Sequence, residues 1–362
     1  MRVLQVINSL ATGGAEKLIL ESIPKYLEQG ITMELLLLDG SPQPFLKQLE
    51  GTNCRIHLLS QGSVYRPSHI FKIIPFLKQY DVVHVHLFPT LYWVALAKML
   101  SFSKVKLVYT EHNTSNRRRG FFFKWFDRFI YNRYNKIVVI TSEVGENLAK
   151  HLGRNPAYFE LIHNGIDIDK FHLATTASRD KFSISEDQKI LIQVSSFTAQ
   201  KDQQTPIKAL SQIEGHPALL LVGTGPLQED CKQLTRDLGL VEVVQFLGTR
   251  MDVPQLLKMA DVVVLSSHYE GLSLSSMEGL ASGTPFVASN VPGLREVVEG
   301  AGVLFPEGDD KALAQEVTRL FADAEYSRSL GVSGVARAKQ FSIEKMISKH
   351  ISLYNELCKN PS

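Results

Sequence analysis

The chain has 362 residues, 44% of them hydrophobic, and a formal net charge of +2. This length fits two domains that each bury a core, and the small net charge provides no overall field to attract nucleic acid. Cys54, Cys231 and Cys358 lie far apart in no metal-binding or redox spacing, which is typical of thiols in a reducing compartment.

No secretion signal is evident, because the apolar run at residues 2–7 is too short for one and instead predicts a first strand. No apolar run approaches the roughly 20 residues that span a bilayer. We therefore expect a cytoplasmic protein, one that could act at the inner face of the cytoplasmic membrane.

Strands and helices alternate through the first half of the chain, which predicts a parallel sheet. Gly13 and Gly14 follow the first strand, where glycine lets the backbone approach a phosphate or a sugar closely; a tight turn without a ligand is the alternative. The absence of G-x-G-x-x-G counts against a nicotinamide enzyme. Strands are expected at 3–7, 33–38, 54–59, 81–86, 106–109 and 137–142, and helices at 16–29, 45–49, 67–79, 91–100 and from 143.

Two histidines, His86 and His112, fall at the carboxyl ends of predicted strands, which is the edge where ligands bind in such sheets. A lone histidine is more often structural, and we favour a functional role for His112 over one for His86. His84 and His86 are expected to point to opposite faces of their strand, so no metal site is predicted.

Residues 117–136 combine basic and aromatic side chains in one amphipathic helix. This composition is typical of a helix that lies on a membrane surface, with aromatic rings at headgroup level and basic groups near anionic lipid. The alternative is a core helix with a solvated basic face. We favour peripheral membrane contact through this segment and expect no nucleic-acid partner.

The polar stretch 174–188 marks a domain boundary, and the same alternation follows it. Ser196 and Lys201 lie in the loop after the first strand of this half, and Gly223 lies in the turn after the second. Strands are expected at 190–194, 218–222, 243–247, 261–265, 286–289 and 302–305, and helices at 205–212, 228–238, 277–281, 309–324 and 343–358.

Residues 260–299 form one strand–helix–strand unit with two carboxylates, Glu270 in the loop after a strand and Glu278 in the first turn of the next helix. A helix N-terminus favours phosphate, and a carboxylate beside it can bind sugar hydroxyls, which indicates a nucleotide-sugar or phosphosugar site. The alternative is structural, because Ser275 and Glu278 also fit a capping box.

This stretch resembles the donor-site signature of retaining glycosyltransferases of the two-domain GT-B type, in the large family numbered four (glycosyl transferases group 1). The family pattern E-G-[FL]-x-[LM]-x-x-x-E-[AG] matches 270–279, and its G-x-P-V-[VI]-[AG]-[ST] strand matches 283–289. Further matches are Gly13–Glu16, Thr110–Asn113, Val222–Leu227 and Pro292–Glu296. The resemblance therefore covers essentially the whole chain.

The resemblance implies two Rossmann-like α/β domains facing across a cleft. Residues 1–170 would bind the acceptor, residues 171–342 would bind the donor, and residues 343–362 would form a helix that packs back on the first domain. It also implies a retaining transfer of a hexose from a nucleotide-diphosphate sugar to a hydroxyl acceptor, which we expect to be a lipid-linked glycan or polysaccharide precursor. No cofactor and no metal are expected.

The resemblance also implies roles for individual residues. Lys201 would neutralise the donor diphosphate, Glu270 would bind sugar hydroxyls, Glu278 would bind the ribose, and His112 would orient the transferred sugar. Ser196 stands where the family has an arginine, so either Arg250 or another base substitutes, or the leaving group is stabilised less strongly. The donor would contact Gly13, Gly14, Ser196, Lys201, Gly223, Arg250, Glu270, Gly271, Leu272, Ser273, Leu274 and Glu278.

Two alternatives remain open at this point. One is a GT-B-type nucleotide-sugar epimerase or phosphorylase, which donor turnover without an acceptor would favour. The other is a non-catalytic protein that binds sugar nucleotides, which the serine at position 196 makes plausible.

Overall fold

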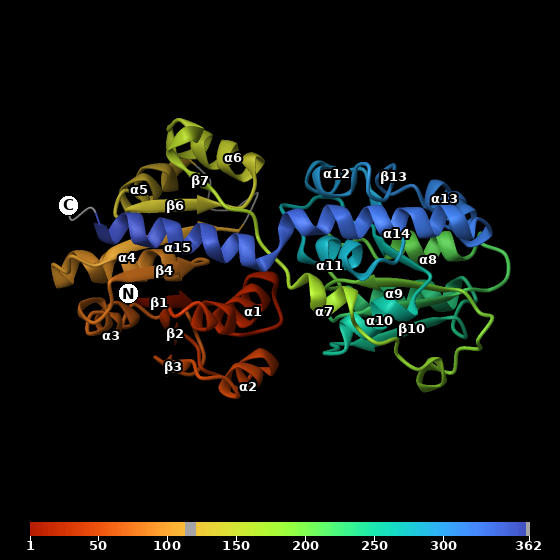
Figure 1. The fold of residues 1–362 in the computed structure, drawn as a ribbon, viewed down its shortest axis with the longest axis horizontal. Helices are drawn as coiled ribbons and strands as arrows, with labels where there is room; N and C mark the ends of the chain where they lie inside the picture. The colour runs from red at the N-terminus through yellow and green to blue at the C-terminus, as the bar shows by residue number, and fades with distance from the viewer. Residues whose placement is uncertain (113–120, 360–362) are drawn as a thin grey trace. The chain divides into compact units, whose positions relative to one another are not determined.

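The fold is described from a computed structural model, which covers residues 1–112 and 121–359. The chain divides into two compact units, unit 1 with residues 1–165 and 343–362 and unit 2 with residues 166–342 (Figure 1). The first and last residues of unit 2 are neighbours, since the Ile166 N–H donates to the Phe341 carbonyl at 2.9 Å and Ile166 pairs with Ser342. The sequence placed the first domain boundary at 170.

Unit 1 contains a parallel sheet with the strand order β3-β2-β1-β4-β5-β6-β7. Its strands are β1 (Arg2–Ile7), β2 (Thr32–Leu37), β3 (Arg55–Leu58), β4 (Val82–His86), β5 (Lys106–Glu111), β6 (Lys136–Val139) and β7 (Glu160–Leu161). Its helices are α1 (Gly14–Glu28), α2 (Pro44–Glu50), α3 (His69–Ile73), α4 (Thr90–Ser101), α5 (Phe121–Tyr131), α6 (Ser142–Leu152) and α15 (Ile343–Lys359).

Unit 2 contains a second parallel sheet with the order β10-β9-β8-β11-β12-β13, which follows the same reversal as the first. Its strands are β8 (Ile190–Val194), β9 (Ala218–Val222), β10 (Val244–Gly248), β11 (Val262–Leu265), β12 (Phe286–Ser289) and β13 (Val303–Phe305). Its helices are α7 (Ile168–His172), α8 (Gln204–Leu210), α9 (Gln228–Asp237), α10 (Val253–Met259), α11 (Leu274–Ser282), α12 (Pro292–Val298), α13 (Asp310–Ala322) and α14 (Ala324–Ala338).

The expected helix at 67–79 is wrong in extent. The structure has α3 over only five residues, followed by a short 3-10 turn at Phe76–Lys78. Pro75 lies between the two pieces, and its missing N–H removes one hydrogen bond from a continuous helix. Each piece buries one apolar side chain, Ile73 in α3 and Leu77 in the 3-10 turn.

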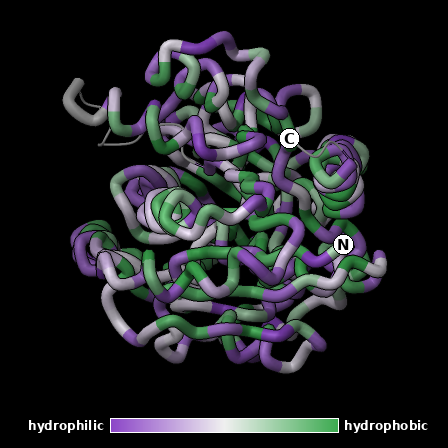
Figure 2. Tube along the Cα trace, turned by 90° about the vertical axis from the view of Figure 1, so that its left-hand side faces the viewer, coloured by the Kyte–Doolittle hydropathy of each residue, from purple (hydrophilic) through white to green (hydrophobic). Residues whose placement is uncertain are grey.

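The last helix, α15, belongs to unit 1 and packs against α1. Its buried residues recur at helical spacing from Ile343 through Ile347 to Tyr354, and Figure 2 shows both green and purple stretches on it. Lys25 of α1 lies 3.3 Å from Glu344. The Tyr26 hydroxyl lies 2.7 Å from His350 Nδ1.

The expectation that His84 and His86 point to opposite faces of β4 is wrong. Side chains alternate along a strand, so residues two apart share a face, and the two rings lie 4.4 Å apart. His84 contacts Tyr354 of α15 through Nδ1 at 2.5 Å and Thr110 of β5 through Nε2 at 2.7 Å. This face of the sheet is therefore polar beneath α1 and α15.

Burial in this cluster keeps its histidines neutral. It lowers the pKa of His112 to about 4 and that of His350 to about 3, and it holds the pKa of His84 and of His86 well below 6.5, with the charge of neighbouring histidines adding to the effect. In the unfolded chain, histidine titrates near pH 6.5. The stability that the neutral rings contribute is thus complete above about pH 6.5 and is lost as the pH falls below it.

We therefore expect unit 1 to lose stability on acidification from pH 7 to pH 5, by about 1.4 kcal/mol per pH unit for each such histidine. Calorimetric unfolding across this range measures the effect. The His350→Gln variant should show a shallower slope than the wild type. An unfolding temperature of unit 1 that stays constant down to pH 5 would contradict this account.

Candidate active site

The site that the sequence pointed to lies at the carboxyl edge of the unit 2 sheet. Strands β8 and β11 are neighbours there, and the chain leaves them towards opposite ends of the sheet. In a doubly wound sheet, this reversal leaves a crevice in which ligands bind. The loop that follows β8 carries Ser195, Ser196 and Lys201, and the loop that follows β11 carries Ser266, Ser267 and Glu270.

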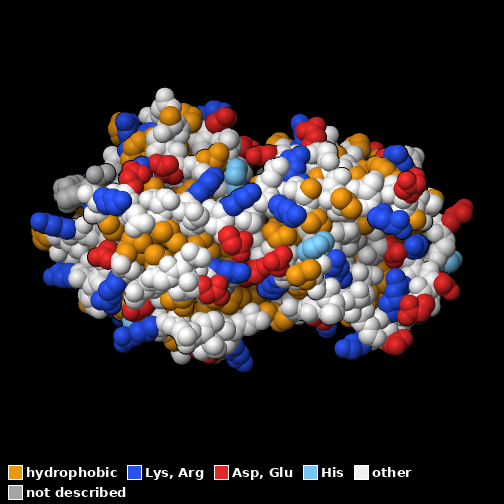
Figure 3. Space-filling view, viewed as in Figure 1, with side chains coloured by type: hydrophobic (Ala, Val, Ile, Leu, Met, Phe, Trp, Pro, Cys, Tyr) orange, Lys and Arg blue, Asp and Glu red, His pale blue; other side chains and the backbone are white. Residues whose placement is uncertain are grey.

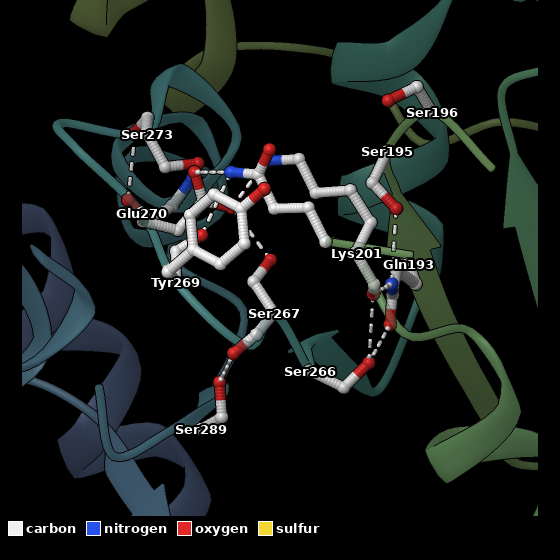
Figure 4. A network of polar contacts seen from close by, with 12 residues as sticks. Gln193, Ser195, Ser196, Lys201, Ser266, Ser267, Tyr269, Glu270, Ser273 and Ser289 are labelled. Carbon is white, nitrogen blue, oxygen red and sulfur yellow. Dashed lines mark hydrogen bonds and ion pairs between the residues drawn. The ribbon is translucent and has the colours of Figure 1, made fainter. Parts of the chain in front are cut away.

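A buried glutamine holds the two loops together. Gln193, on β8, donates from Nε2 to Ser195 Oγ at 3.0 Å and to the Lys201 carbonyl at 2.8 Å. Ser266 Oγ donates to the Asp202 carbonyl at 2.6 Å and lies 3.0 Å from Gln193 Oε1 (Figure 4). The loop after β8 is thus fixed to the end of β11 by side chains that are themselves buried.

Lys201 and Glu270 meet at the centre of this edge. Lys201 Nζ donates to Glu270 Oε1, and Ser267 Oγ donates to the same oxygen at 2.6 Å. Gln200 Nε2 lies 3.5 Å from Glu270 Oε2 and donates to the Tyr269 carbonyl at 2.8 Å. The side chains of Lys201 and Glu270 are only 16% and 6% exposed, so the charges are largely withdrawn from water.

Glycines allow the backbone to close around this pair. A Cβ on Gly293, in the first turn of α12, would lie 2.2 Å from the carbonyl oxygens of Glu270 and Gly271. A Cβ on Gly223, where φ is +133°, would lie 2.2 Å from the Ser195 carbonyl oxygen. Any larger residue at either position would displace a loop of the site.

Helix α11 begins at Leu274, before the start expected at residue 277. Its N-cap is Ser273, whose Oγ accepts from the Ser276 N–H at 3.4 Å, so Ser275 and Glu278 do not form the capping box of the structural alternative. Glu278 instead lies in the second turn of α11, where it is 2% exposed. Leu272 and Ser273 are also buried, whereas Gly271 and Leu274 are half-buried.

Ser196 and Arg250 are placed apart from the Lys201–Glu270 pair. The Ser196 carbonyl accepts from Gln203 Nε2 at 2.8 Å, and Figure 4 shows its side chain away from Glu270. Arg250 donates to both carboxylate oxygens of Asp252, at 2.8 and 2.6 Å, and its guanidinium lies 5.7 Å from the centre of the Phe182 ring. Arg250 is therefore already paired with an acid of its own loop.

Three candidate residues belong to unit 1. Gly13 is the N-cap of α1 and Gly14 its first residue; a Cβ on Gly13 would lie 2.2 Å from Glu16 Oε2. His112 follows β5, and its Nε2 lies 3.0 Å from His86 Nδ1. Asn113, which completes the motif around His112, lies outside the described residues.

Several residues of this network were missed by the sequence reasoning, among them Gln193, Gln200, Ser195 and Ser267. Gln193 did carry a signal, because it is the one polar residue in the otherwise apolar strand Ile190–Val194. The serines carried none, since serine is common in any loop. Among residues 1–112 and 121–359, no cluster of His, Cys, Asp or Glu could hold a metal ion, and no helix could cross a membrane.

Two parallel-sheet α/β units with this strand order define the GT-B fold, as expected from the sequence. The crystal structure of HepE from Anabaena in complex with UDP and glucose has a TM-score of 0.86 to this chain at 21% identity, over 98% of this chain and 100% of that one. The structure of WaaG, a glycosyltransferase of lipopolysaccharide biosynthesis, has a TM-score of 0.72 at 16% identity, over 97% and 99% of the two chains.

Sequence comparison identifies the family. Residues 174–335 match the model for glycosyl transferases group 1, and residues 12–170 match the model for glycosyltransferase family 4. N-acetyl-alpha-D-glucosaminyl L-malate synthase of Bacillus anthracis is 29% identical over 77% of this chain and 76% of its own. The UDP-Gal:alpha-D-GlcNAc-diphosphoundecaprenol alpha-1,3-galactosyltransferase of Escherichia coli is 26% identical over 78% and 77%.

The chain belongs to the group 1 glycosyltransferases, and it is an enzyme of that class. Both the family and the fold that the sequence predicted are thereby confirmed.

The ion pair at the site gives a direct test of the local structure. We expect Lys201→Met to lower the free energy of unfolding of unit 2 by about 3 kcal/mol, because it leaves a buried carboxylate without its cation. Combining it with Glu270→Gln should recover part of that loss. Urea unfolding measures both effects.

The exposed pair Lys232–Glu229 provides the matched control, since its side chains are 36% and 76% exposed. Lys232→Met should change the stability by less than about 0.5 kcal/mol. If Lys201→Met were as mild as Lys232→Met, Lys201 and Glu270 would not form a buried pair.

Proposed function

We propose that this glycosyltransferase moves a hexose from a nucleotide-diphosphate sugar to a hydroxyl acceptor, with retention at the anomeric carbon. The observation that carries the proposal is the buried Lys201–Glu270 pair at the reversal point of the unit 2 sheet, directly before α11. A cation, a carboxylate and a helix N-terminus at one edge suit a sugar diphosphate, because the cation and the helix N-terminus can bind the diphosphate and the carboxylate can bind sugar hydroxyls.

In this proposal, Lys201 and the N-terminal turn of α11 hold the diphosphate. An ammonium group has three N–H donors, and one of them serves Glu270, so the others remain to contact phosphate oxygens. Glu270 accepts from sugar hydroxyls and Glu278 from the ribose hydroxyls. His112 of unit 1 orients the transferred sugar, a role that rests on the family resemblance.

The reaction breaks the bond between the anomeric carbon and the diphosphate oxygen and forms a bond from that carbon to the acceptor oxygen. The acceptor proton passes to the departing diphosphate, on the face from which it leaves. The enzyme contributes by positioning the reactants and by stabilising the negative charge of the leaving group.

A uridine diphosphate sugar is the first donor to test. HepE is described in complex with UDP and glucose, and the E. coli relative is named for UDP-Gal. The same relative is named for an acceptor linked to diphosphoundecaprenol, which supports our proposal of a lipid-linked acceptor or polysaccharide precursor.

A screen of nucleotide sugars by thermal shift, followed by assays of hydrolysis and transfer, tests this function. A donor at 100 times its Kd should stabilise the protein by about 2.7 kcal/mol. Glu270→Gln should abolish transfer, whereas Glu307→Gln, at the exposed acid that contacts His268 at 2.8 Å, should leave it unchanged. NMR of the product gives its anomeric configuration. Near-normal turnover in Glu270→Gln would refute the assigned site, and an inverted product would refute retention.

We further propose that helix α5 contacts a membrane surface. Trp125, Phe126 and Phe129 are 72%, 42% and 39% exposed on it, although Ile130 and Tyr131 are buried against the sheet. Arg128 and Arg133 are exposed beside them, and Figure 3 shows basic and hydrophobic side chains together at the end of unit 1 that carries α4 and α5. This is the composition of an interfacial helix.

Other parts of the predicted segment do not add to this surface. Lys136 is paired with Glu160 at 2.6 Å and Glu356 at 3.4 Å. Residues 117–120, with three of the predicted arginines, lie outside the described residues, as do the side chains of residues 121–123. The proposal therefore depends on the exposed side chains between residues 125 and 133.

We expect Trp125→Ser to weaken binding to vesicles that contain phosphatidylglycerol, because among the described side chains of α5 it removes the most exposed aromatic ring. Cosedimentation measures the binding. Val332→Ser, at an exposed apolar residue of α14 in unit 2, is the control and should have no effect. Equal vesicle binding by Trp125→Ser and the wild type would remove the membrane proposal.

A further inference from the structure

A chain of three side chains leads from the middle of the unit 1 sheet to His112. Gln5 of β1 lies 2.8 Å from His86 Nε2 through its Oε1, and His86 Nδ1 lies 3.0 Å from His112 Nε2. Gln5 and His86 are 1% and 3% exposed. All three residues share one face of the sheet, because residues two apart on a strand lie on the same side and β1, β4 and β5 are neighbours.

The orientation of the Gln5 amide is fixed by what lies on its other side. Gln5 Nε2 lies 3.8 Å from Met33 Sδ, and a thioether sulfur can accept a hydrogen bond but cannot donate one. The side chain also hydrogen-bonds to the Tyr354 hydroxyl, which can accept from the same NH2 group, so the NH2 group faces Met33 and Tyr354. The carbonyl oxygen Oε1 consequently faces His86, where it can only accept.

The direction of the hydrogen bond between Gln5 and His86 determines the direction of the one between His86 and His112. Because Oε1 only accepts, His86 carries its proton on Nε2, and burial keeps the ring neutral, so its Nδ1 has a lone pair. His112 must then donate from its own Nε2 to His86 Nδ1. Since His112 is neutral too, its Nδ1 carries a lone pair and is an acceptor.

The tautomer of the neighbouring histidine, His84, is not fixed in this way. His84 contacts the hydroxyls of Tyr354 and Thr110, and a hydroxyl can either donate or accept. Either tautomer of His84 satisfies both partners. Gln5 differs because one of its partners, the Met33 sulfur, has no proton to give.

We propose that Gln5 and His86 are positioning residues that hold His112 in the tautomer protonated on Nε2, so that His112 Nδ1 accepts a hydrogen bond from a hydroxyl of the transferred sugar. The second half of this statement rests on the proposed function, in which His112 orients that sugar. The first half concerns the protein alone. Gln5 and His86 thus act through His112 and need not touch the substrate.

Two-bond 1H–15N correlation spectra of the full chain labelled with 15N-histidine test the first half without any ligand. His112 is assigned by comparison with His112→Gln. We expect the wild type to show His112 protonated on Nε2. A wild-type spectrum with His112 protonated on Nδ1 would overturn the proposal, whatever the variants do.

Gln5→Leu should reverse the tautomer. Without an acceptor at position 5, His86 gains by moving its proton to Nδ1, where it donates to His112 Nε2, and His112 then carries its proton on Nδ1. Tyr134→Phe is the control, because it removes one buried hydroxyl, the one that donates to the Leu91 carbonyl at 2.6 Å, and leaves the contacts of Gln5, His86 and His112 intact. A His112 signal that is the same in Gln5→Leu and the wild type would overturn the proposal.

Kinetics with the donor found by the screen test the second half. Gln5→Leu should lower kcat/KM for transfer about tenfold, the scale of one lost hydrogen bond, and leave the Kd for the bare nucleotide diphosphate unchanged. A reversed tautomer with unchanged kcat/KM would refute the contact with the sugar. If no nucleotide sugar binds at all, the proposed function fails, whereas the wild-type spectrum still decides the tautomer.

Discussion

Parallel strand pairing is the constraint on which the rest of this structure depends. When all strands of a sheet run the same way, every loop that follows a strand emerges at the same edge. Where the strand order reverses, the loops after two adjacent strands lead to opposite sides of the sheet and leave a crevice between them. Lys201 and Glu270 follow the adjacent strands β8 and β11, and they meet there although 69 positions separate them. Gly293 then closes the site, since only a residue without a Cβ lets α12 begin against the Glu270 carbonyl.

The sequence predicted this much because strand ends and glycine turns leave local signals. It placed the strands that precede Lys201 and Glu270, and the family resemblance assigned both residues to one donor site. It failed where a feature depends on geometry beyond the local pattern. Helix α11 begins at Leu274 and not at residue 277, and the helix expected at 67–79 stops before Pro75. The faces of His84 and His86 were assigned wrongly, although the period of a strand is enough to place them together.

The two units share one feature that sequence reasoning passed over. Gln5 and Gln193 are each a single buried amide within an apolar strand, and those strands, β1 and β8, are the first strands of their sheets. Burying an amide costs free energy unless its donors and acceptor are bonded. Gln193 meets this need by joining the loops around Lys201, and Gln5 meets it through Met33 and His86. Neither set of partners can be read from the strand itself, because the register with neighbouring strands decides it.

The serine at position 196 changes the electrostatics that the proposed reaction requires. Lys201 is balanced by Glu270, and Arg250 by Asp252, so neither pair contributes a net positive charge. A leaving diphosphate would then be stabilised by the remaining N–H donors of Lys201 and by backbone N–H groups at the start of α11, where the Ser276 N–H is already bonded to Ser273. Such dipoles stabilise charge only when they are fixed beforehand, because water would otherwise compete for them. Gly293 packs directly against the backbone of the Glu270 loop and holds it in place. In the proposed reaction, this fixed backbone would compensate for the cation that the family pattern has and this chain lacks.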